Sequence, residues 1–278
     1  MKKLLILLFF TILIQVNKTE AQFKIVGYIP NWANLKTFSD GFNYTRVTHL
    51  NIAFKDPNTS GDLPALSANE AYLVNAAHNQ GVQVLLSLCG GGSSNDTSKQ
   101  NLYFKLIKST NVSAFASKIT QYVITNHLDG IDLDLEGPAI NSDFGSFVQV
   151  LADSLHPAGK VLSAALSEGY GGASVPTSTF SYLDWINIMA YDACGPTWGT
   201  PGQHSSYQFA MDNLAYWKNR GLAKSKAVLG IPFYGYGFDS NFSSSAYPFS
   251  YIETNYPDDI YSDQTANTIY YNGISTII

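Results

Sequence analysis

The stretch LDGIDLDLEGP, at residues 128–138, carries the strongest signal for the fold of this chain. Asp132, Asp134 and Glu136 lie two residues apart, so on a β-strand all three carboxylates point to one face. Isoleucine and leucine alternate with them and face an apolar layer on the other side. Three acids this close cannot all stay ionised under low dielectric without partners. Because such a row does not help folding, we interpret it as a set of reacting groups.

Two plainer explanations of the acidic row are weaker. A solvated acidic edge strand would not carry so apolar an opposite face. A metal site would need further ligands, but the segment contains no histidine and no matching cluster lies nearby in the sequence. We therefore expect no bound metal.

Short strand-like segments alternate with helical patterns along the chain. Segments such as 114–127 and 142–156 repeat apolar residues at i, i+3, i+4 and i+7, the period of an amphipathic helix. Strands that alternate with helices imply parallel β/α units with right-handed crossovers, and the chain length favours an α/β fold, the (β/α)8 TIM barrel. The predicted strands lie at 24–30, 47–54, 82–88, 128–136, 161–167, 185–191 and 227–234.

Five further segments carry motifs beside DGIDLDLE, in this order: KIVGYIPNW (24–32), VTHLNIAF (47–54), VQVLLSLCGGG (82–92), WINIMAYD (185–192) and LGIPFYGYGF (229–238). Together the six resemble the strand motifs of glycoside hydrolase family 18, the chitinases and their relatives. DGIDLDLE is similar to the family's DxxDxDxE signature and IMAYD contains its MxYD motif. Cys89 and an extra glycine depart from the usual SxGG spelling after the third strand. The resemblance covers nearly all of the chain after residue 22.

The end of the chain does not complete the barrel. Similar family members place a YYNG-type turn after the seventh strand, then a helix and an eighth strand, whereas here IYYNGISTII (269–278) follows directly. We expect a truncated barrel with the eighth strand missing, and residues 274–278 not pairing between 227–234 and 24–30. The alternative is that ISTII itself forms strand eight, which its β-branched residues permit. The segment between FYGYGF and YYNG is too short for the large α+β insertion of bigger chitinases.

The resemblance implies the roles of four residues in a retaining, substrate-assisted hydrolysis of chitin, in which the substrate's own N-acetyl oxygen attacks the anomeric carbon. Glu136 would act as general acid and then as base. Asp134 would bind the acetamido N–H, with Asp132 sharing a proton beneath it. Tyr191 would donate its hydroxyl to the acetamido oxygen.

Further residues are candidates for substrate binding. Asp192 follows the sixth strand and would contact Glu136 or a sugar hydroxyl, or else cap a helix. Met189 faces the same side as Tyr191 and equally suits barrel filling. Asp129 is out of phase with the other acids and is expected to satisfy loop amides. The aromatic candidates for stacking on sugar rings are Tyr28 and Trp198, with most weight, and Trp32, Phe54 and Tyr234.

The first residues and the composition bear on location and partners. MKKLLILLFFTILIQV, followed by small residues at Thr19 and Ala21, predicts a signal peptide at residues 1–21, with an uncleaved anchor as the alternative. The domain at 22–278 would then be secreted, extracellular or periplasmic. A net charge of −5 argues against nucleic acid or a membrane as partner, so we expect a monomer that binds chitin or an N-acetylglucosamine oligosaccharide without a cofactor. Cys89 and Cys194 are expected to be free, buried thiols.

Two other functions remain open at this point. An endo-β-N-acetylglucosaminidase would cut the core of N-glycans with the same acids, but such enzymes often lack the tyrosine of MxYD, which Tyr191 supplies here. A shallow groove would favour it. A non-catalytic chitin-binding protein is the third possibility; lectins of this family usually lose the last acid of the signature, whereas Glu136 is present.

Overall fold

The structure is a computed structural model that describes residues 23–91, 95–199, 202–237, 246–255, 269–271 and 274–277. For the last two ranges it describes the backbone alone. The signal peptide predicted for residues 1–21 lies outside the described residues.

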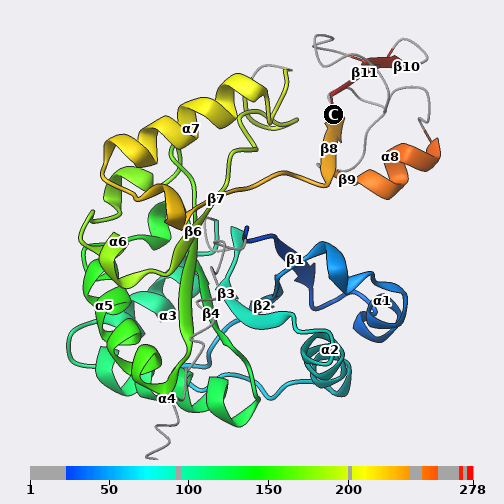
Figure 1. Ribbon diagram of the computed structural model, residues 1–278. Helices are drawn as coiled ribbons and strands as arrows, with labels where there is room; N and C mark the ends of the chain where they lie inside the picture. The colour runs from blue at the N-terminus through cyan, green and yellow to red at the C-terminus, as the bar shows by residue number, and fades with distance from the viewer. Residues whose placement is uncertain are drawn as a thin grey trace, which may run out of the picture.

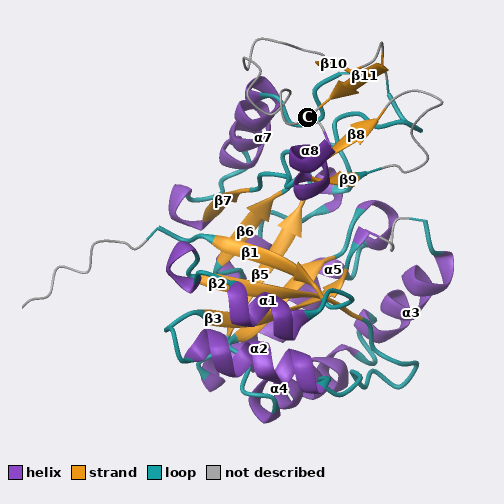
Figure 2. Ribbon diagram, turned by 90° about the vertical axis from the view of Figure 1, so that its right-hand side faces the viewer, coloured by secondary structure: helices purple, strands orange, loops and turns teal. Residues whose placement is uncertain are grey.

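Seven parallel strands form one sheet, and each pairs with its neighbour in sequence order. The sheet curls into an incomplete barrel, with helices around its outer face (Figures 1 and 2). This confirms the predicted barrel of parallel β/α units. The strands are β1 (Val26–Pro30), β2 (His49–Lys55), β3 (Gln83–Cys89), β4 (Gly130–Asp134), β5 (Val161–Leu166), β6 (Trp185–Ile188) and β7 (Ala227–Leu229).

The helices follow the predicted apolar period. In α5, Phe144, Phe147, Val148 and Leu151 are all buried, the i, i+3, i+4, i+7 stripe of a helix packed on a core. The predicted helices at 114–127 and 142–156 correspond to α4 and α5. No helix in the described part of the chain is long and apolar enough to cross a membrane. The helices are α1 (Leu35–Gly41), α2 (Ala68–His78), α3 (Thr97–Ile107), α4 (Val112–Thr125), α5 (Phe144–Leu155), α6 (Thr179–Tyr182), α7 (Tyr207–Asn219) and α8 (Phe249–Asn255).

The seventh strand is shorter than predicted, and the prediction that it reaches residue 234 was wrong. The amide of Gly230 still donates to the carbonyl of Ile188 at 2.8 Å, but pairing stops there. Pro232 lacks an N–H and cannot extend a ladder. The chain therefore leaves the barrel sheet, and Tyr234 begins a strand elsewhere.

A second, antiparallel sheet lies beside the barrel and was not predicted from the sequence. Its strands run in the order β10 (Ile269–Tyr271), β11 (Ile274–Ile277), β8 (Tyr234–Gly237) and β9 (Tyr247–Pro248). An extended segment connects it to β7, and α8 lies next to it (Figure 1). β11 pairs with β8, with Thr276 opposite Gly237. The prediction that residues 274–278 do not close the barrel is confirmed for 274–277.

The barrel sheet is therefore open between β7 and β1. Among the described residues no strand pairs with both. Several apolar side chains on and next to these two strands are exposed: Ile25 by 50%, Leu229 by 38%, Ile231 by 70% and Phe233 by 76%.

Both cysteines are buried thiols that form no disulfide in the described part of the chain, as predicted. Cys89 ends β3 with φ of 82°, a left-handed conformation that L-residues seldom adopt. The amide of the next residue, Gly90, donates to the carbonyl of Asp134 at 3.0 Å, which holds the end of β3 against the end of β4. This contact places the glycine turn after β3 beside the acidic row.

Candidate active site

Asp132 lies in the barrel interior, fully buried, and accepts four hydrogen bonds. Its Oδ2 accepts from the hydroxyls of Tyr28 at 2.8 Å and Ser87 at 2.7 Å. Its Oδ1 accepts from the Ser163 hydroxyl at 2.6 Å and from Nδ2 of Asn187 at 3.1 Å. Burial raises the pKa of Asp132, and these neutral donors lower it in part. The four donors come from β1, β3, β5 and β6, so this carboxylate on β4 joins side chains from four other strands of the barrel.

The orientation of Asn187 is set from below by Trp185, two residues earlier on β6. The indole Nε1 can only donate, and it donates to Oδ1 of Asn187 at 3.1 Å. The amide nitrogen of Asn187 then faces Asp132 and also donates to the Tyr28 hydroxyl at 2.8 Å. The Tyr28 hydroxyl hydrogen is thereby left for Asp132. The buried indole of Trp185 thus orients the Asn187 amide, which in turn donates to Asp132, the first acid of the row.

The carboxyl groups of Asp134 and Glu136 hydrogen-bond to each other. Asp134 is 5% exposed, and its Oδ1 has no hydrogen-bond partner in the described part of the chain. Burial, followed by the charges of Glu136 and Asp132, raises the pKa of Asp134 well above its usual range. Burial also raises the pKa of Glu136, although the hydrogen bond from Asp134 opposes the rise. Burial therefore favours the protonated forms of Asp134 and Glu136, whereas both oxygens of Asp132 accept hydrogen bonds from other side chains.

Glu136 extends beyond the end of β4 and keeps the extended backbone that places it in phase with Asp132 and Asp134. It precedes a short 3₁₀ helix at Gly137–Ala139. Gly91 lies under its carboxylate, since a Cβ there would come within 3.3 Å of Oε1. Gly137 lies under the ring of Tyr170, which a Cβ would approach to 2.2 Å. Glycine at both positions leaves room for the acid at the carboxyl end of the strands, where barrel active sites lie.

Tyr191 lies three residues beyond the end of β6. Burial and the charges of Asp134 and Asp192 raise the pKa of its phenol, so that the hydroxyl stays protonated and can donate. Its ring meets that of Tyr234 edge-on, with centroids 6.1 Å apart. A Cβ on Gly230 would come within 2.8 Å of the Tyr191 ring, so the glycine that follows β7 leaves room for this tyrosine.

Asp192 binds side chains of the second sheet and does not cap a helix. Its Oδ1 accepts from the hydroxyls of Tyr234 at 2.6 Å and Tyr236 at 2.8 Å. Burial raises the pKa of Asp192, but hydrogen bonds from His204, Tyr234 and Tyr236 outweigh it and lower the pKa. Asp192 thus stays ionised, and its negative charge in turn raises the pKa of Glu136.

The residues predicted to bind substrate differ in how close they lie to the acids and in how exposed they are. The Tyr28 ring is 37% exposed while its hydroxyl reaches Asp132, and Trp198 is 41% exposed with its indole nitrogen 3.2 Å from the carbonyl oxygen of Asp192. Both therefore border the acids. Phe54 packs on Gly90, where a Cβ would come within 2.7 Å of its ring, and Met189 is buried. Trp32 is 75% exposed on the loop after β1.

Five residues of the site were missed by the sequence analysis: Ser87, Ser163, Asn187, Tyr236 and His204. For the first three a signal was available, because each is a polar residue inside an otherwise apolar strand, at the position whose side chain points inward with the acids. Tyr236 and His204 belong to segments whose place depends on the unpredicted second sheet. Asp129 accepts from the amide of Val84 at 2.7 Å, so its expected structural role is confirmed.

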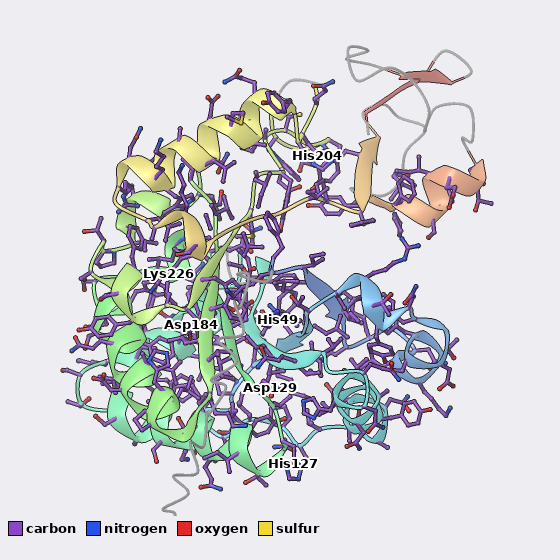
Figure 3. The ribbon with its side chains drawn as sticks, in the orientation of Figure 1. His49, His127, Asp129, Asp184, His204 and Lys226 are labelled. Atoms are coloured by element: carbon purple, nitrogen blue, oxygen red, sulfur yellow. The ribbon has the colours of Figure 1, made fainter. Side chains whose placement is uncertain are left out.

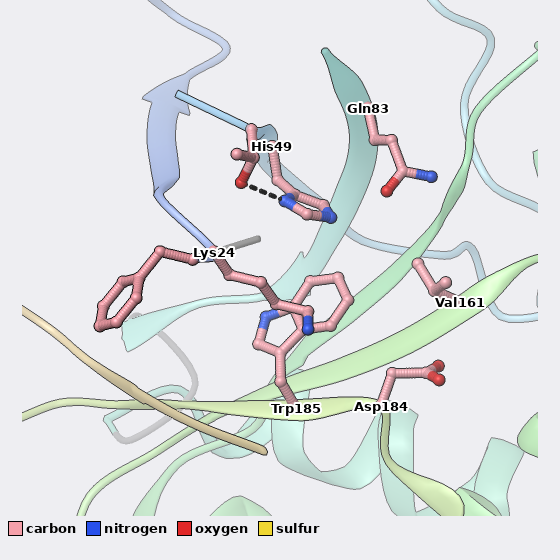
Figure 4. Close-up of a pocket in the computed structure, with 8 residues that line it drawn as sticks. Lys24, His49, Gln83, Val161, Asp184 and Trp185 are labelled. Atoms are coloured by element: carbon pink, nitrogen blue, oxygen red, sulfur yellow. Dashed lines mark hydrogen bonds between the residues drawn. The ribbon is translucent and has the colours of Figure 1, made fainter. Parts of the chain in front are cut away.

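A pocket of about 360 Å³ lies at the opposite end of the barrel, at the amino ends of the strands (Figure 4). Figure 3 shows His49, Asp129 and Asp184 at this end and His204 near β8. Among the described residues no group of three or more His, Cys, Asp or Glu side chains is arranged to hold a metal ion. The pocket is lined by Phe23, Lys24, Thr48, His49, Gln83, Val161, Asp184 and Trp185.

A parallel β/α barrel with a pair of hydrogen-bonded carboxyl groups at the carboxyl ends of its strands fits the class of the glycoside hydrolases. The sequence model described as glycosyl hydrolases family 18 matches residues 24–273. The chain belongs to this family.

Curated relatives agree with the family assignment. The chain is 27% identical over 258 residues to probable chitinase 10 of Drosophila melanogaster, covering 79% of this chain and 11% of the relative. It is 29% identical over 228 residues to a class V chitinase of Arabidopsis thaliana, covering 72% and 59%. A chitinase-like effector of Moniliophthora perniciosa is 26% identical over 257 residues, covering 80% and 58%. The chain thus spans from about a tenth to three fifths of the length of these relatives.

Solved structures share the fold. The GH18 chitinase ChiB from the chitin utilization locus of Flavobacterium johnsoniae superposes with a TM-score of 0.77 and 30% identity, covering 91% of this chain and 79% of that one. A GH18 chitinase from Cycas revoluta in complex with (GlcNAc)3 superposes with a TM-score of 0.76 at 20% identity, covering 90% and 86%. At 20% identity, the similarity to the Cycas revoluta structure shows a shared fold.

Proposed function

We propose that this chain hydrolyses β-1,4-linked N-acetylglucosamine polymers with retention of configuration and with assistance from the substrate's acetamido group. The observation that carries the proposal is the buried, hydrogen-bonded pair of Asp134 and Glu136, in which burial raises the pKa of both carboxyls. Glu136 stands at the open end of the row, so it is the member of the pair that can reach a glycosidic oxygen. Tyr191 supplies a protonated hydroxyl nearby.

In the first step the acetamido carbonyl oxygen attacks the anomeric carbon. The bond between that carbon and the leaving oxygen breaks, and its electron pair goes to the oxygen, which takes the proton of Glu136. A cyclic oxazolinium ion forms on the sugar. In the second step Glu136 takes a proton from water, the water oxygen attacks the anomeric carbon, and the ring opens. A positioned acid and base of this kind contributes about 10²–10⁴-fold in rate.

Asp134 acts on the charge that develops on the acetamido nitrogen. Once the proton has moved to the leaving group, the carboxylate of Asp134 accepts the acetamido N–H. Asp132, which accepts hydrogen bonds from four donors, lies below Asp134 on the same face of the strand and supports its orientation. Tyr191 donates to the acetamido oxygen and holds it in line for attack.

The test is hydrolysis of chitin oligomers by wild type and by Glu136→Gln. We expect the variant to lose turnover and to keep its fold and oligomer binding, whereas Glu253→Gln, an exposed exchange on α8, leaves turnover unchanged. Proton NMR of the first product should show the β-anomer. More than a few per cent of wild-type turnover in Glu136→Gln would refute the acid assignment.

Two alternatives are tested in the same assay. Cleavage of an N-glycan core in preference to chitin oligomers would indicate an endo-β-N-acetylglucosaminidase. The presence of Tyr191 favours chitin. A non-catalytic chitin-binding role is favoured by the similarity to a protein named a chitinase-like effector, and by the open barrel sheet. Binding without turnover by the wild-type chain would support it.

We also propose that the chain is secreted and acts as a monomer. The amino-terminal lysines and apolar run support export. Detection of the chain outside the cell, beginning near residue 22, tests this.

A further inference from the structure

His204 is a buried imidazole in the loop between β6 and α7, and neither the family motifs nor the mechanism above uses it. Its Nε2 lies 3.3 Å from the carbonyl oxygen of Tyr234, the first residue of β8. Its Nδ1 lies 3.3 Å from the amide nitrogen of Asp192 and 3.4 Å from Oδ1 of the same residue. One ring therefore spans the loop that carries Asp192 and the second sheet.

The two ring nitrogens have unequal tasks. A carbonyl oxygen only accepts, so Nε2 must carry a hydrogen. Nδ1 faces a donor and an acceptor of the same residue. When the ring is neutral, Nδ1 accepts a hydrogen bond from the Asp192 N–H. When the ring is protonated, Nδ1 cannot accept and donates instead to Oδ1 of Asp192. That oxygen already accepts from the hydroxyls of Tyr234 and Tyr236. The contacts of Asp192 thus depend on the protonation of His204.

The surroundings hold His204 in place for both states. Its carbonyl accepts from the amide of Ala193 at 3.0 Å, and the Ser205 hydroxyl donates to the carbonyl of Ala190 at 2.8 Å. Its ring packs against Tyr234 and Tyr236 of β8, with centroids 5.3 and 4.9 Å away. The titratable groups that face this cluster are Asp192, Tyr191, Tyr234, Tyr236 and the Cys194 thiol.

We propose that His204 is a positioning residue that fixes Asp192 against β8, and that protonation of its imidazole moves its contact from the Asp192 amide to the Asp192 carboxylate. The effect reaches the reacting acid because Asp192 acts on Glu136 through its charge. As the pH falls, the protonated ring competes with the two tyrosines for Oδ1 and neutralises Asp192, so that activity declines on the acid side. This inference deepens the proposed hydrolysis and rests on it for its kinetic part.

The kinetic test compares kcat/KM against pH for wild type, His204→Gln and Asp192→Asn on chitin oligomers. Glutamine keeps a donor toward Tyr234 but cannot be protonated, so the acid limb of His204→Gln should move to lower pH by about half a unit. His156→Gln is the matched control, because His156 also pairs with an aspartate, Asp184, at the far end of the barrel. Its profile should coincide with that of wild type. An unmoved acid limb in His204→Gln would overturn the proposal.

A second measurement needs no turnover. The chain has five histidines, and the imidazole signal of His204 is the one absent from NMR spectra of His204→Gln. In Asp192→Asn the chemical shift of this signal should differ from that in wild type, because the carboxylate oxygen 3.4 Å from Nδ1 is gone. Identical chemical shifts in both proteins would refute the pairing. If chitin is not the substrate, wild type shows no turnover while the change in chemical shift persists, so the two failures are distinguishable.

Discussion

Nδ2 of Asn187 lies 3.1 Å from Oδ1 of Asp132, across the interior of the barrel from β6 to β4. This contact joins the strand that leads to the MxYD motif with the strand that carries the acidic row. The side-chain amide of Asn187 has two N–H hydrogens. One is donated to Asp132 and the other to the Tyr28 hydroxyl. The geometry of the row thus depends on a residue without chemistry of its own.

Replacing Asn187 by leucine should destabilise the protein and reduce activity. The change leaves the buried Asp132 carboxylate short of a donor, which typically costs about 1–3 kcal/mol. Urea unfolding measures the loss. In an Asp132→Asn background the loss should be smaller, and equal losses in both backgrounds would show that packing, rather than the hydrogen bond, is responsible.

Removing the Tyr191 hydroxyl with Tyr191→Phe should lower kcat on chitin oligomers by about 10²–10³-fold, the usual effect of losing one transition-state donor. The ring contact with Tyr234 remains, so the fold should persist. Tyr207→Phe, on an 80% exposed side chain of α7, serves as the control. A loss confined to KM would contradict a role in the transition state.

Asp134→Asn should stabilise the protein increasingly as the pH rises. Burial raises the pKa of Asp134 well above its usual range, so the folded state holds a proton that the unfolded chain has released. Stability from this group is therefore full below the unfolded pKa and is lost as pH rises through the folded pKa. Melting temperatures of wild type and variant between pH 4 and 9 measure the difference. A gap that narrows with pH would contradict the assignment.

Fully deacetylated glucosamine oligomers should not be cleaved, and thiazoline analogues of the oxazolinium ion should inhibit. Without the acetamido oxygen the row offers no nucleophile opposite Glu136, since Asp132 and Asp134 lie on the same strand face as Glu136. Product analysis by mass spectrometry on matched chitin and chitosan oligomers checks this. Comparable rates on both would rule out substrate assistance.

At high protein concentration the open edge of the barrel should promote self-association of the chain, which we propose acts as a monomer. Ile231 and Phe233 are exposed beside β7, and unpaired edges recruit further strands. The double variant Ile231→Lys, Phe233→Lys should remain monomeric to higher concentration in light scattering. Tyr207→Lys, which exchanges an equally exposed ring far from the edge, should not.

The sequence was a good guide where periodicity and local geometry decide the outcome. The alternation of acidic and apolar residues around Asp132 predicted a β-strand and correctly placed the three acids on one face of it. The apolar stripes of α4 and α5 predicted these two helices. It failed where distant segments decide. Tyr234 lies in an apolar, aromatic run that suits a barrel strand. Pro232 interrupts the ladder, however, and Tyr234 pairs in the second sheet with strands from later in the chain. His204 belongs to the site through that same sheet, so no local pattern marks it.

The enclosure of Asp132 also guards strand alignment during folding. Tyr28, Ser87, Ser163 and Asn187 come from four strands, and a slip of one residue in any of them would turn its donor to the opposite face of the sheet. A buried carboxyl group would then be left without hydrogen-bond partners inside the barrel, at a penalty that a misaligned apolar core alone does not impose. The acid at the base of the row therefore discriminates against wrong pairings before any substrate arrives.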